Sequence, residues 1–312
     1  MKDIDIVKRL LGTIRSVITP YVTDDYWLLE VPYYNNVGDT LIWQGELDFL
    51  SDIPHKCKGM FSFWSKKQPN LSKGDLVLFQ GGGNFGDLWK DPHEYRKRIM
   101  VQNPQCRYFI FPQTIYYRDK ENLAKDAEFF SRYDCTICAR DNVSYCLLKD
   151  NFKNNAVLAP DMAFCIDIDR WRESKLTGAS KPIILKRNDM EFRSTDQLEK
   201  VITSLDADVA DWVPLTTRSL EDRVKSIILR NPRILGWLFD RYMQGFYRRY
   251  LIRSGVRQLE YYSDVFTTRL HACILSILLR KEHIVLFDNV YGKNRSFYDT
   301  WLSDCDNVEI MK

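Results

Sequence analysis

An arginine and a histidine at the start of an apolar helix are the residues best suited to chemistry. Arg269 and His271 occur in the sequence Thr-Thr-Arg-Leu-His, directly before an apolar run that ends at Leu279. A helix that is apolar nearly all round is buried, so both side chains lie at a buried helix N-terminus, where the backbone dipole adds positive charge. Few acids lie nearby in the sequence, and a buried charge without a counter-charge is costly. The segment therefore predicts an anion-binding site; pairing with Asp264 or with backbone carbonyls is the structural alternative.

A second arginine follows a different predicted strand. Arg140 comes directly after the apolar stretch 135–138. Because ligands of open parallel sheets bind at the carboxyl ends of the strands, Arg140 can meet the same ligand as Arg269. The alternative is an ordinary pair between Arg140 and Asp141, at the surface or through a helix cap.

Small and amide residues follow two further predicted strands. Residues 33–39 contain two asparagines and a glycine, so backbone N–H groups at a helix start can face an anion or a sugar hydroxyl there, and we expect Asp39 to cap that helix. Glycines 81–83 allow a backbone to approach a ligand closely, although a tight structural turn explains them equally well. Neither segment matches the dinucleotide-binding or P-loop glycine patterns.

Parallel βα units must position these residues, because short β-rich apolar runs alternate with helical patterns along the chain. The first series of predicted strands spans residues 26–31, 76–79, 108–111, 135–138 and 156–159, and the second spans 182–186, 210–215, 265–266 and 284–287. The stretch 167–181 between the series is polar and contains a glycine. We therefore predict two α/β domains, 1–170 and 171–290, with the site in the cleft between them and a tail, 291–312, that packs back toward the first domain.

Residues 223–257 differ from the rest of the chain. They carry nine Lys or Arg against one acid, Asp240, with six aromatic residues interleaved. One interpretation is an inserted helical hairpin, bent at Pro232, whose basic faces are solvated. The other is an amphipathic element that rests on an anionic membrane surface.

Composition and charge disfavour a nucleic-acid-binding, metal-binding or membrane-spanning protein. The net charge of the 312 residues is only +3, which disfavours nucleic-acid binding and requires a local site for any anion. Several of the eight cysteines lie in apolar runs, as buried thiols do in a reducing cytosol, and the CxxC at 135–138 lacks the second pair of a zinc site. We predict no metal and no role for His55, His93 or His283, which lie in polar or strand-edge contexts. The N-terminus lacks a signal-peptide core and no apolar run could cross a bilayer, so a cytoplasmic location is predicted.

Taken together, these segments resemble the polysaccharide pyruvyl transferase family. The motifs are YNNVGD at 34–39, GGGNFGD at 81–87, FPQ at 111–113, ARD at 139–141 with Ser144, APD at 159–161, TRLH at 268–271 and YGKN at 291–294. The resemblance implies two Rossmann-like domains in a GT-B-like arrangement and phosphoenolpyruvate as the donor substrate, without a further cofactor. It implies transfer of pyruvate to a sugar of a cell-surface polysaccharide precursor, as a cyclic ketal, with release of phosphate. No family motif matches 223–257.

The resemblance places Arg140, Arg269 and His271 in the donor site, where two arginine forks suit a ligand with a carboxylate and a phosphate. His271 is the catalytic candidate, with the roles of acid, base and phosphate clamp all open. The remaining assignments are Leu270 and Lys293 on the donor side, and Asn36, Gly38, Asp39, Gly82, Gly83 and Asn84 on the acceptor side.

Two rival functions use the same residues differently. A GT-B-type glycosyltransferase would bind a nucleotide sugar on the same scaffold, since a fold does not fix a function. A non-catalytic partner of an assembly complex would dock on the membrane through 223–257, and its pocket would have no catalytic activity. If the acceptor is lipid-linked, the basic segment 223–257 would hold the enzyme at the inner face of the membrane.

Overall fold

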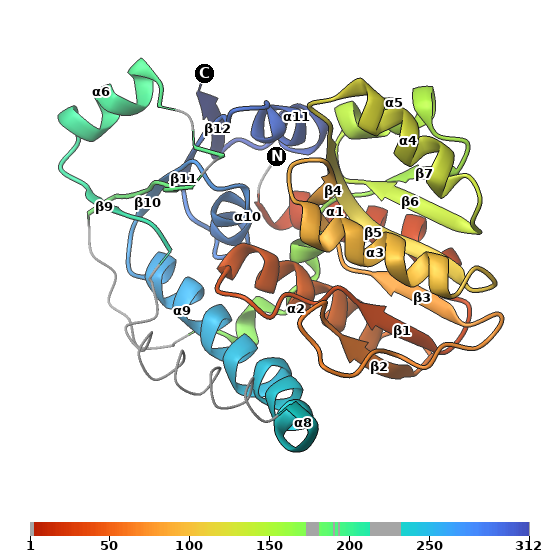
Figure 1. Ribbon diagram of the computed structural model, residues 1–312. Helices are drawn as coiled ribbons and strands as arrows, with labels where there is room; N and C mark the ends of the chain where they lie inside the picture. The colour runs from red at the N-terminus through yellow and green to blue at the C-terminus, as the bar shows by residue number, and fades with distance from the viewer. Residues whose placement is uncertain (1–2, 173–180, 190, 193, 213–231, 312) are drawn as a thin grey trace.

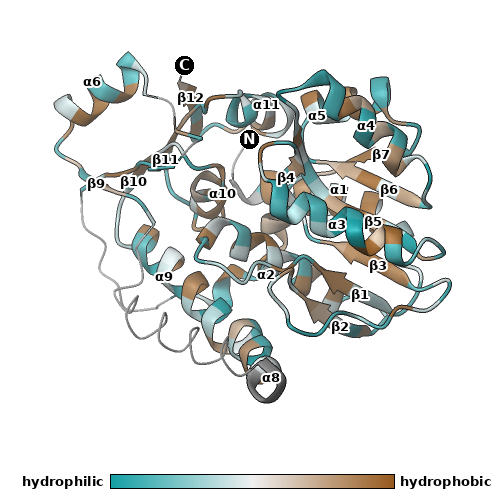
Figure 2. Ribbon diagram, in the orientation of Figure 1, coloured by the Kyte–Doolittle hydropathy of each residue, from teal (hydrophilic) through white to brown (hydrophobic). Residues whose placement is uncertain are grey.

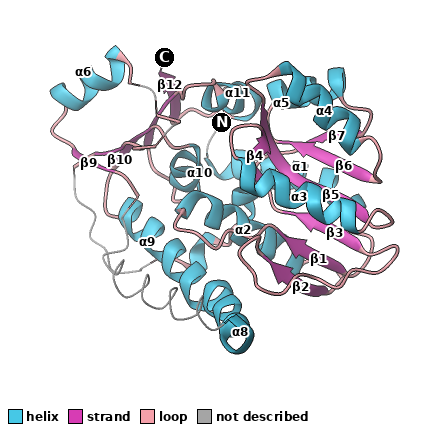
Figure 3. Ribbon diagram, viewed as in Figure 1, coloured by secondary structure: helices cyan, strands magenta, loops and turns pink. Residues whose placement is uncertain are grey.

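The computed structural model describes residues 3–172, 181–189, 191–192, 194–212 and 232–311. Within these residues the framework consists of two parallel sheets (Figures 1 and 3). The first sheet has the order β2 (Cys57–Phe61), β1 (Tyr26–Leu29), β3 (Leu76–Phe79), β5 (Arg107–Tyr116), β6 (Cys135–Ala139) and β7 (Asn155–Leu158), with β4 (Gly82–Gly86) paired to β5. The second has the order β12 (Val308–Met311), β11 (His283–Phe287), β10 (Asp264–Thr267), β8 (Ile183–Leu185) and β9 (Asp208–Ala210). Parallel sheets need helical crossovers, which cover their faces.

Helices and short 3-10 turns connect these strands. In the first half they are α1 (Asp3–Ile18), η1 (Thr19–Tyr21), α2 (Val37–Ser51), α3 (Lys90–Gln102), α4 (Lys120–Phe130), α5 (Asn142–Asn151), η2 (Met162–Cys165) and η3 (Ile168–Arg170). In the second half they are α6 (Asp196–Ser204), α8 (Pro232–Tyr242), the π-helical turn η4 (Met243–Tyr247), α9 (Arg248–Glu260), α10 (Leu270–Leu278) and α11 (Lys293–Trp301). Figure 2 shows mainly hydrophobic central strands beneath helices with hydrophilic outer faces.

The predicted parallel α/β organisation is confirmed, and most strands lie where the sequence predicts them. Three details are wrong. β5 continues to Tyr116, because its second half pairs with the glycine-rich segment, which is strand β4 rather than a loop. β9 precedes the predicted strand 210–215, of which 213–215 lie outside the described residues. Asn36, not Asp39, is the N-cap of α2; its Oδ1 accepts the N–H of Asp39 in the first helical turn.

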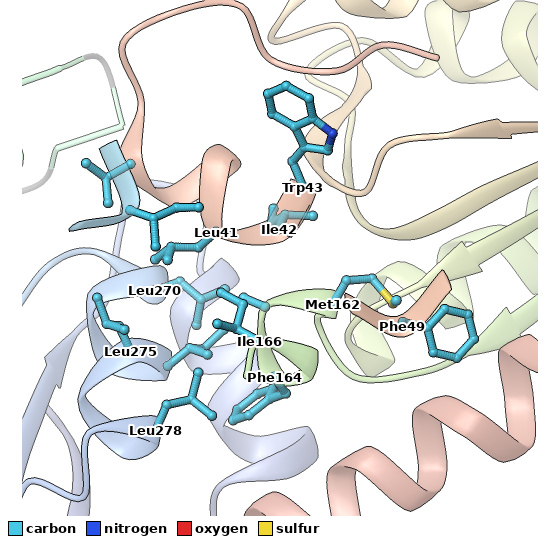
Figure 4. Packing of buried hydrophobic residues seen from close by; sticks show 14 of the residues in the cluster. Leu41, Ile42, Trp43, Phe49, Met162, Phe164, Ile166, Leu270, Leu275 and Leu278 are labelled. Atoms are coloured by element: carbon cyan, nitrogen blue, oxygen red, sulfur yellow. The ribbon is translucent and has the colours of Figure 1, made fainter. Parts of the chain in front are cut away.

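One continuous hydrophobic cluster joins elements of both halves of the chain. Leu41 and Phe49 of α2, Phe164 of η2 and Leu275 of α10 all belong to it, and Figure 4 shows these helices packed against one another. The approach of α2 to η2 is so close that a Cβ on Gly45 would lie 1.8 Å from a backbone carbonyl oxygen. This common core holds the carboxyl ends of the two sheets at a fixed spacing.

Helix α11 adds polar links between the chain's end and the first sheet. Thr300 accepts a hydrogen bond from the N–H of Asn142 at 3.0 Å, Ser296 donates to Asp141 at 2.8 Å, and the Trp301 indole donates to the backbone oxygen of Arg140 at 2.8 Å. The predicted boundary near residue 171 falls beside 173–180, which lie outside the described residues, so the division into two domains stays a prediction. Among the described residues no helix is long and apolar enough to span a membrane.

Candidate functional site

A pocket of about 460 Å³ lies where loops from the carboxyl ends of both sheets meet. Its lining includes ten of the eleven predicted site residues: Asn36, Gly38, Asp39, Gly83, Asn84, Arg140, Arg269, Leu270, His271 and Lys293. Gly82 is not among the lining residues. It lies behind the wall, where an added Cβ would meet the side chains of Ile42 and Asp39.

Arg269 is paired with carboxylates that are distant in sequence. Its Nε and Nη2 donate to the two carboxylate oxygens of Asp211 at 2.5 and 2.7 Å, and Asp189 lies 3.6 Å away. Few acids do lie near Arg269 in the sequence, but the expectation that its charge lacks a counter-charge is wrong, and its partner is Asp211 rather than Asp264. Asp211 follows β9 and Asp189 follows β8, so the parallel sheet brings both to Arg269 at its carboxyl edge.

Arg140 is fully buried rather than at the surface. Its Nε donates to Thr114 at 2.8 Å and its Nη1 donates to Asp161 at 2.7 Å. Asp141 does not pair with Arg140; its side chain caps α5 by accepting the N–H of Ser144. Nη2 makes no hydrogen bond to any described residue and lies 3.5 Å from the position of a Cβ on Gly83, at the pocket wall.

His271 lies between Asp161 and the first turn of α2. Its Nε2 is 3.4 Å from Asp161 Oδ2, an ion-pair separation, and makes no hydrogen bond to a described residue. On the other side, a Cβ on Gly38 would lie 2.5 Å from Nδ1. Glycine at position 38 is therefore required by the imidazole rather than by the backbone angle.

Asp161 joins Arg140 to His271, and the sequence analysis gave it no role. It is fully buried, and burial alone would raise the pKa of its carboxyl. The charges of His271 and Arg140 and the N–H of Ala163 outweigh burial and hold the pKa of Asp161 well below its usual range. Asp161 lies three residues beyond the end of strand β7 and within the APD motif at 159–161, and these are the signals that could have identified it.

Lys293 forms a buried ion pair with Glu191, which also accepts from Arg187 at 2.5 Å. Burial lowers the pKa of Lys293. Burial opposes ionisation of Glu191 too, but the charges of Lys293 and Arg187 prevail and keep the pKa of Glu191 well below normal. Arg187, Asp189 and Glu191 line the pocket and were missed, although they follow β8 as Arg140 follows β6.

The start of α2 supplies a polar wall. Asp39 accepts hydrogen bonds from the hydroxyl of Tyr34 at 2.9 Å and from the amide of Asn36 at 2.7 Å. The backbone N–H of Asn84 donates to Gln113 Oε1 at 3.2 Å, and Asn84 lines the pocket. Oxygen and amide groups of this kind can receive the hydroxyls of a sugar.

A buried glutamate lies behind the glycine-rich strand. Glu46 of α2 accepts the N–H of Gly81 at 2.7 Å through Oε1, while Oε2 has no hydrogen-bond partner among the described residues. Burial raises the pKa of Glu46 well above its usual value. Its carboxyl is therefore harder to ionise in the folded protein than in the unfolded chain.

Other residues considered in the sequence lie apart from the pocket. His93, expected in a polar or strand-edge context, is buried, with Nε2 2.6 Å from Asp126. All eight cysteines are free, and Cys57 and Cys146 are exposed. No three His, Cys, Asp or Glu side chains gather to hold a metal ion within the described ranges, and the absence of a cofactor stays a prediction.

These features define an α/β protein of two parallel sheets with a pocket lined by charged side chains at their carboxyl edges. The chain belongs to the polysaccharide pyruvyl transferase family, whose model matches residues 36–286. It is 30% identical to EpsO of Bacillus subtilis (strain 168) over 302 residues, which cover 91% of this chain and 87% of that protein. It is 28% identical to Pyruvyl transferase 1 of Schizosaccharomyces pombe (strain 972 / ATCC 24843) over 302 residues, covering 91% and 72%.

The same fold occurs in a solved structure. The crystal structure of KP1_0663 from Klebsiella pneumoniae subsp. pneumoniae NTUH-K2044 matches with a TM-score of 0.64 and covers 97% of this chain and 98% of that chain. The sequence identity is 19%, so the likeness concerns the fold alone.

Proposed function

We propose that this protein transfers pyruvate from phosphoenolpyruvate to a sugar of a cell-surface polysaccharide precursor, forming a cyclic ketal and releasing phosphate. The convergence of Arg140, Arg269 and His271 in one pocket, from strand ends of both sheets, carries the proposal. Family membership supports a pyruvyl transferase with a sugar acceptor.

The arginines offer donors to a small dianion. Arg140 Nη2 has no partner among the described residues, and Asp211 occupies Nε and Nη2 of Arg269, which leaves Nη1 for a ligand. Guanidinium forks match carboxylate and phosphate geometry. Lys293 Nζ lies 3.9 Å from a Cβ position on Gly83, beside Arg140, and adds a third positive group. Phosphoenolpyruvate carries a carboxylate and a phosphate on three carbons, so each arginine can take one anionic group.

The reaction balances with two sugar hydroxyls. One hydroxyl oxygen bonds to C2 of the donor while a proton adds to C3, which turns the methylene into a methyl group. The second hydroxyl oxygen then bonds to C2 as the C2–O bond to phosphate breaks. Of the two hydroxyl protons, one is balanced by the proton gained at C3 and the other leaves with the phosphate.

His271 is the group that moves the proton. Its ring is held between Gly38 and Asp161, with Nε2 3.4 Å from Asp161 Oδ2. A positioned imidazole contributes about 10²–10⁴-fold to such a step. Asp161 also balances the charge of Arg140, so one carboxylate holds both the arginine and the histidine in position.

The arrangement of the two sheets supports a division of the chain into two domains. We propose that they belong to two Rossmann-like domains, 1–170 and 171–290, in a GT-B-like arrangement, followed by the tail 291–312. Two parallel sheets whose carboxyl edges meet at one pocket favour this division. The hydrogen bonds of α11 with residues 140–142 favour a tail whose helix packs toward the first sheet, whereas its strand β12 pairs with β11 in the second.

The basic segment supports a cytoplasmic protein that touches the inner face of the membrane, with a lipid-linked acceptor. Its described part, from Pro232 at the start of α8 to the end of α9, is helical; 223–231 lie outside the described residues, so the hairpin stays untested. Trp237, Leu238 and Phe246 are exposed, and exposed arginines accompany them. Arg248 is the exception, because its guanidinium lies 5.3 Å from the Trp43 ring and bonds Gln44. Burial lowers the pKa of Arg248 to about 10.

Titration calorimetry with phosphoenolpyruvate and a panel of nucleotide sugars tests the donor. We expect saturable binding of phosphoenolpyruvate alone, lost in Arg269→Ala and retained in Arg132→Ala. Arg132 is a suitable control because it is an exposed arginine that pairs with Glu128, four residues earlier in the sequence. Binding of a nucleotide sugar in place of phosphoenolpyruvate would instead identify a glycosyltransferase and contradict the proposal.

A further inference from the structure

One side of the pocket carries an aromatic surface to which the family motifs give no role. Tyr34, Phe63 and Trp64 line it, with ring centroids 6.3 Å apart between the first two and 5.3 Å apart between the last two. Trp64 is 52% exposed. An exposed indole adds little to the folding core, so its position at a pocket mouth points to a ligand.

The turn that carries Trp64 is fixed by hydrogen bonds. The N–H of Ser62 donates to Ser65 Oγ at 3.0 Å, the N–H of Ser65 donates to Ser62 O at 3.0 Å, and the N–H of Trp64 donates to Ser62 Oγ at 3.3 Å. Both serines are buried. The indole is therefore presented on a rigid backbone, which reduces the entropy lost when a ligand binds.

Helix α8 buttresses this turn from outside the pocket. Ser65 Oγ donates to Asp240 at 2.7 Å, and a Cβ on Gly236 would lie 3.2 Å from Lys66. Gln244 in the following turn donates to Met60 O at 3.0 Å, at the end of β2. Figure 1 shows α8 beside β2, at the edge of the first sheet. The part of the basic segment that forms α8 therefore supports the turn that carries Trp64, a role that no sequence motif indicated.

Polar groups complete the same pocket. Asn36, Asp39 and Asn84 line it together with the aromatic surface. A pyranose ring has the matching character, with an apolar face of C–H groups and an edge of hydroxyls. Pockets of this kind bind by apolar contact and use a few polar groups for orientation.

We infer that Trp64 is the stacking platform for a pyranose ring of the acceptor glycan. This inference rests on the proposed function, and adds to it a residue that selects the acceptor without touching the donor. The ring lies with its C–H face on the indole and its hydroxyl edge toward Asn36 and Asn84. Trp64 is thus a binding residue, and its removal weakens acceptor binding while the donor site stays intact.

The test uses the full-length protein saturated with phosphoenolpyruvate. Calorimetric titrations employ the methyl glycosides of glucose, galactose, mannose and N-acetylglucosamine, in both anomers, and β-linked disaccharides of each. We expect at least one glycoside to bind wild type, Trp64→Ala to weaken it about tenfold or more, and Trp64→Phe to lie between them. Trp237→Ala is the matched control, since Trp237 is 57% exposed on α8 but does not line the pocket.

Each outcome bears on a separate claim. Wild-type glycoside affinity in Trp64→Ala would overturn the stacking platform, and so would equal losses in Trp64→Ala and Trp237→Ala. No glycoside binding to wild type at concentrations of roughly 100 mM, far above ordinary millimolar affinities, would overturn it as well. Failure of wild type to bind phosphoenolpyruvate would instead count against the donor. An unchanged affinity of Trp64→Ala for phosphoenolpyruvate shows that the variant is folded.

Discussion

Replacing Gly38 by alanine should disable the site while leaving the fold intact. The added Cβ would lie 2.5 Å from His271 Nδ1 and 3.0 Å from Cγ. An ordinary contact needs about 3.5 Å, so the imidazole must recede by about 1 Å. A displacement of that size at a reacting group costs on the order of 10²-fold in rate.

Stability should respond differently from activity. The atoms that clash belong to a side-chain ring that can rotate, and alanine is favoured over glycine in a helix by about 1 kcal/mol. The free energy of unfolding of Gly38→Ala should therefore stay within about 1 kcal/mol of the wild-type value. Gly12→Ala in α1 is the matched control, because nothing lies within 4 Å of its added Cβ. It should leave activity unchanged.

The assay is phosphate release from phosphoenolpyruvate in the presence of an acceptor glycan, with denaturant unfolding measured on the same preparations. We expect kcat to fall in Gly38→Ala and to hold in Gly12→Ala. Wild-type turnover in Gly38→Ala would refute the view that the position of His271 governs catalysis. Extensive loss of stability would refute the argument that the strain is confined to one ring.

Three further outcomes follow from other contacts. Because burial raises the pKa of Glu46 above its usual value of 4.5, the unfolding free energy of the wild type should fall relative to that of Glu46→Gln as the pH rises from 4.5 toward the folded pKa, with a limiting slope of about 1.4 kcal/mol per pH unit. Parallel pH profiles from denaturant unfolding would contradict this. Gly45→Ala should destabilise by about 3 kcal/mol in thermal unfolding, because its Cβ meets backbone at 1.8 Å rather than a mobile ring. Neutralising Arg249 and Arg253, with Arg248 left unchanged, should weaken binding to anionic vesicles by about 1 kcal/mol per charge, as measured by co-sedimentation. Unchanged binding would contradict the membrane proposal.

The sequence predicted which strand ends line the pocket better than it predicted which charged residues form ion pairs. Strand β3 is a continuous apolar run covered on both faces, and such runs are readable without a structure. Arg140 could be placed at the carboxyl edge of one sheet, and Arg269 and His271 at that of another, because parallel strands share their direction. The ion pairs could not be predicted in this way, because they depend on strand register and on crossover geometry between segments that are distant in sequence.

The missed residues illustrate that difference. Asp211 and Glu191 follow strands of only three residues, whose short runs give weak signals of where the strand ends. Trp64 sits in a turn after an edge strand, where composition indicates only a loop. Nothing in the local sequence tells that α8 lies against that turn, because Ser65 and Asp240 are 175 residues apart.

The last helix has a consequence for how substrates enter. Because α11 carries Lys293 at its start and bonds the backbone of Arg140 near its end, it braces the two sheets on the side of the pocket. A hinge opening wide enough to part the sheets would break these bonds and expose the common core between α2 and α10. Such a swing is opposed by apolar burial as well as by polar links. A ligand that reaches the pocket without parting the sheets leaves both these bonds and the common core in place.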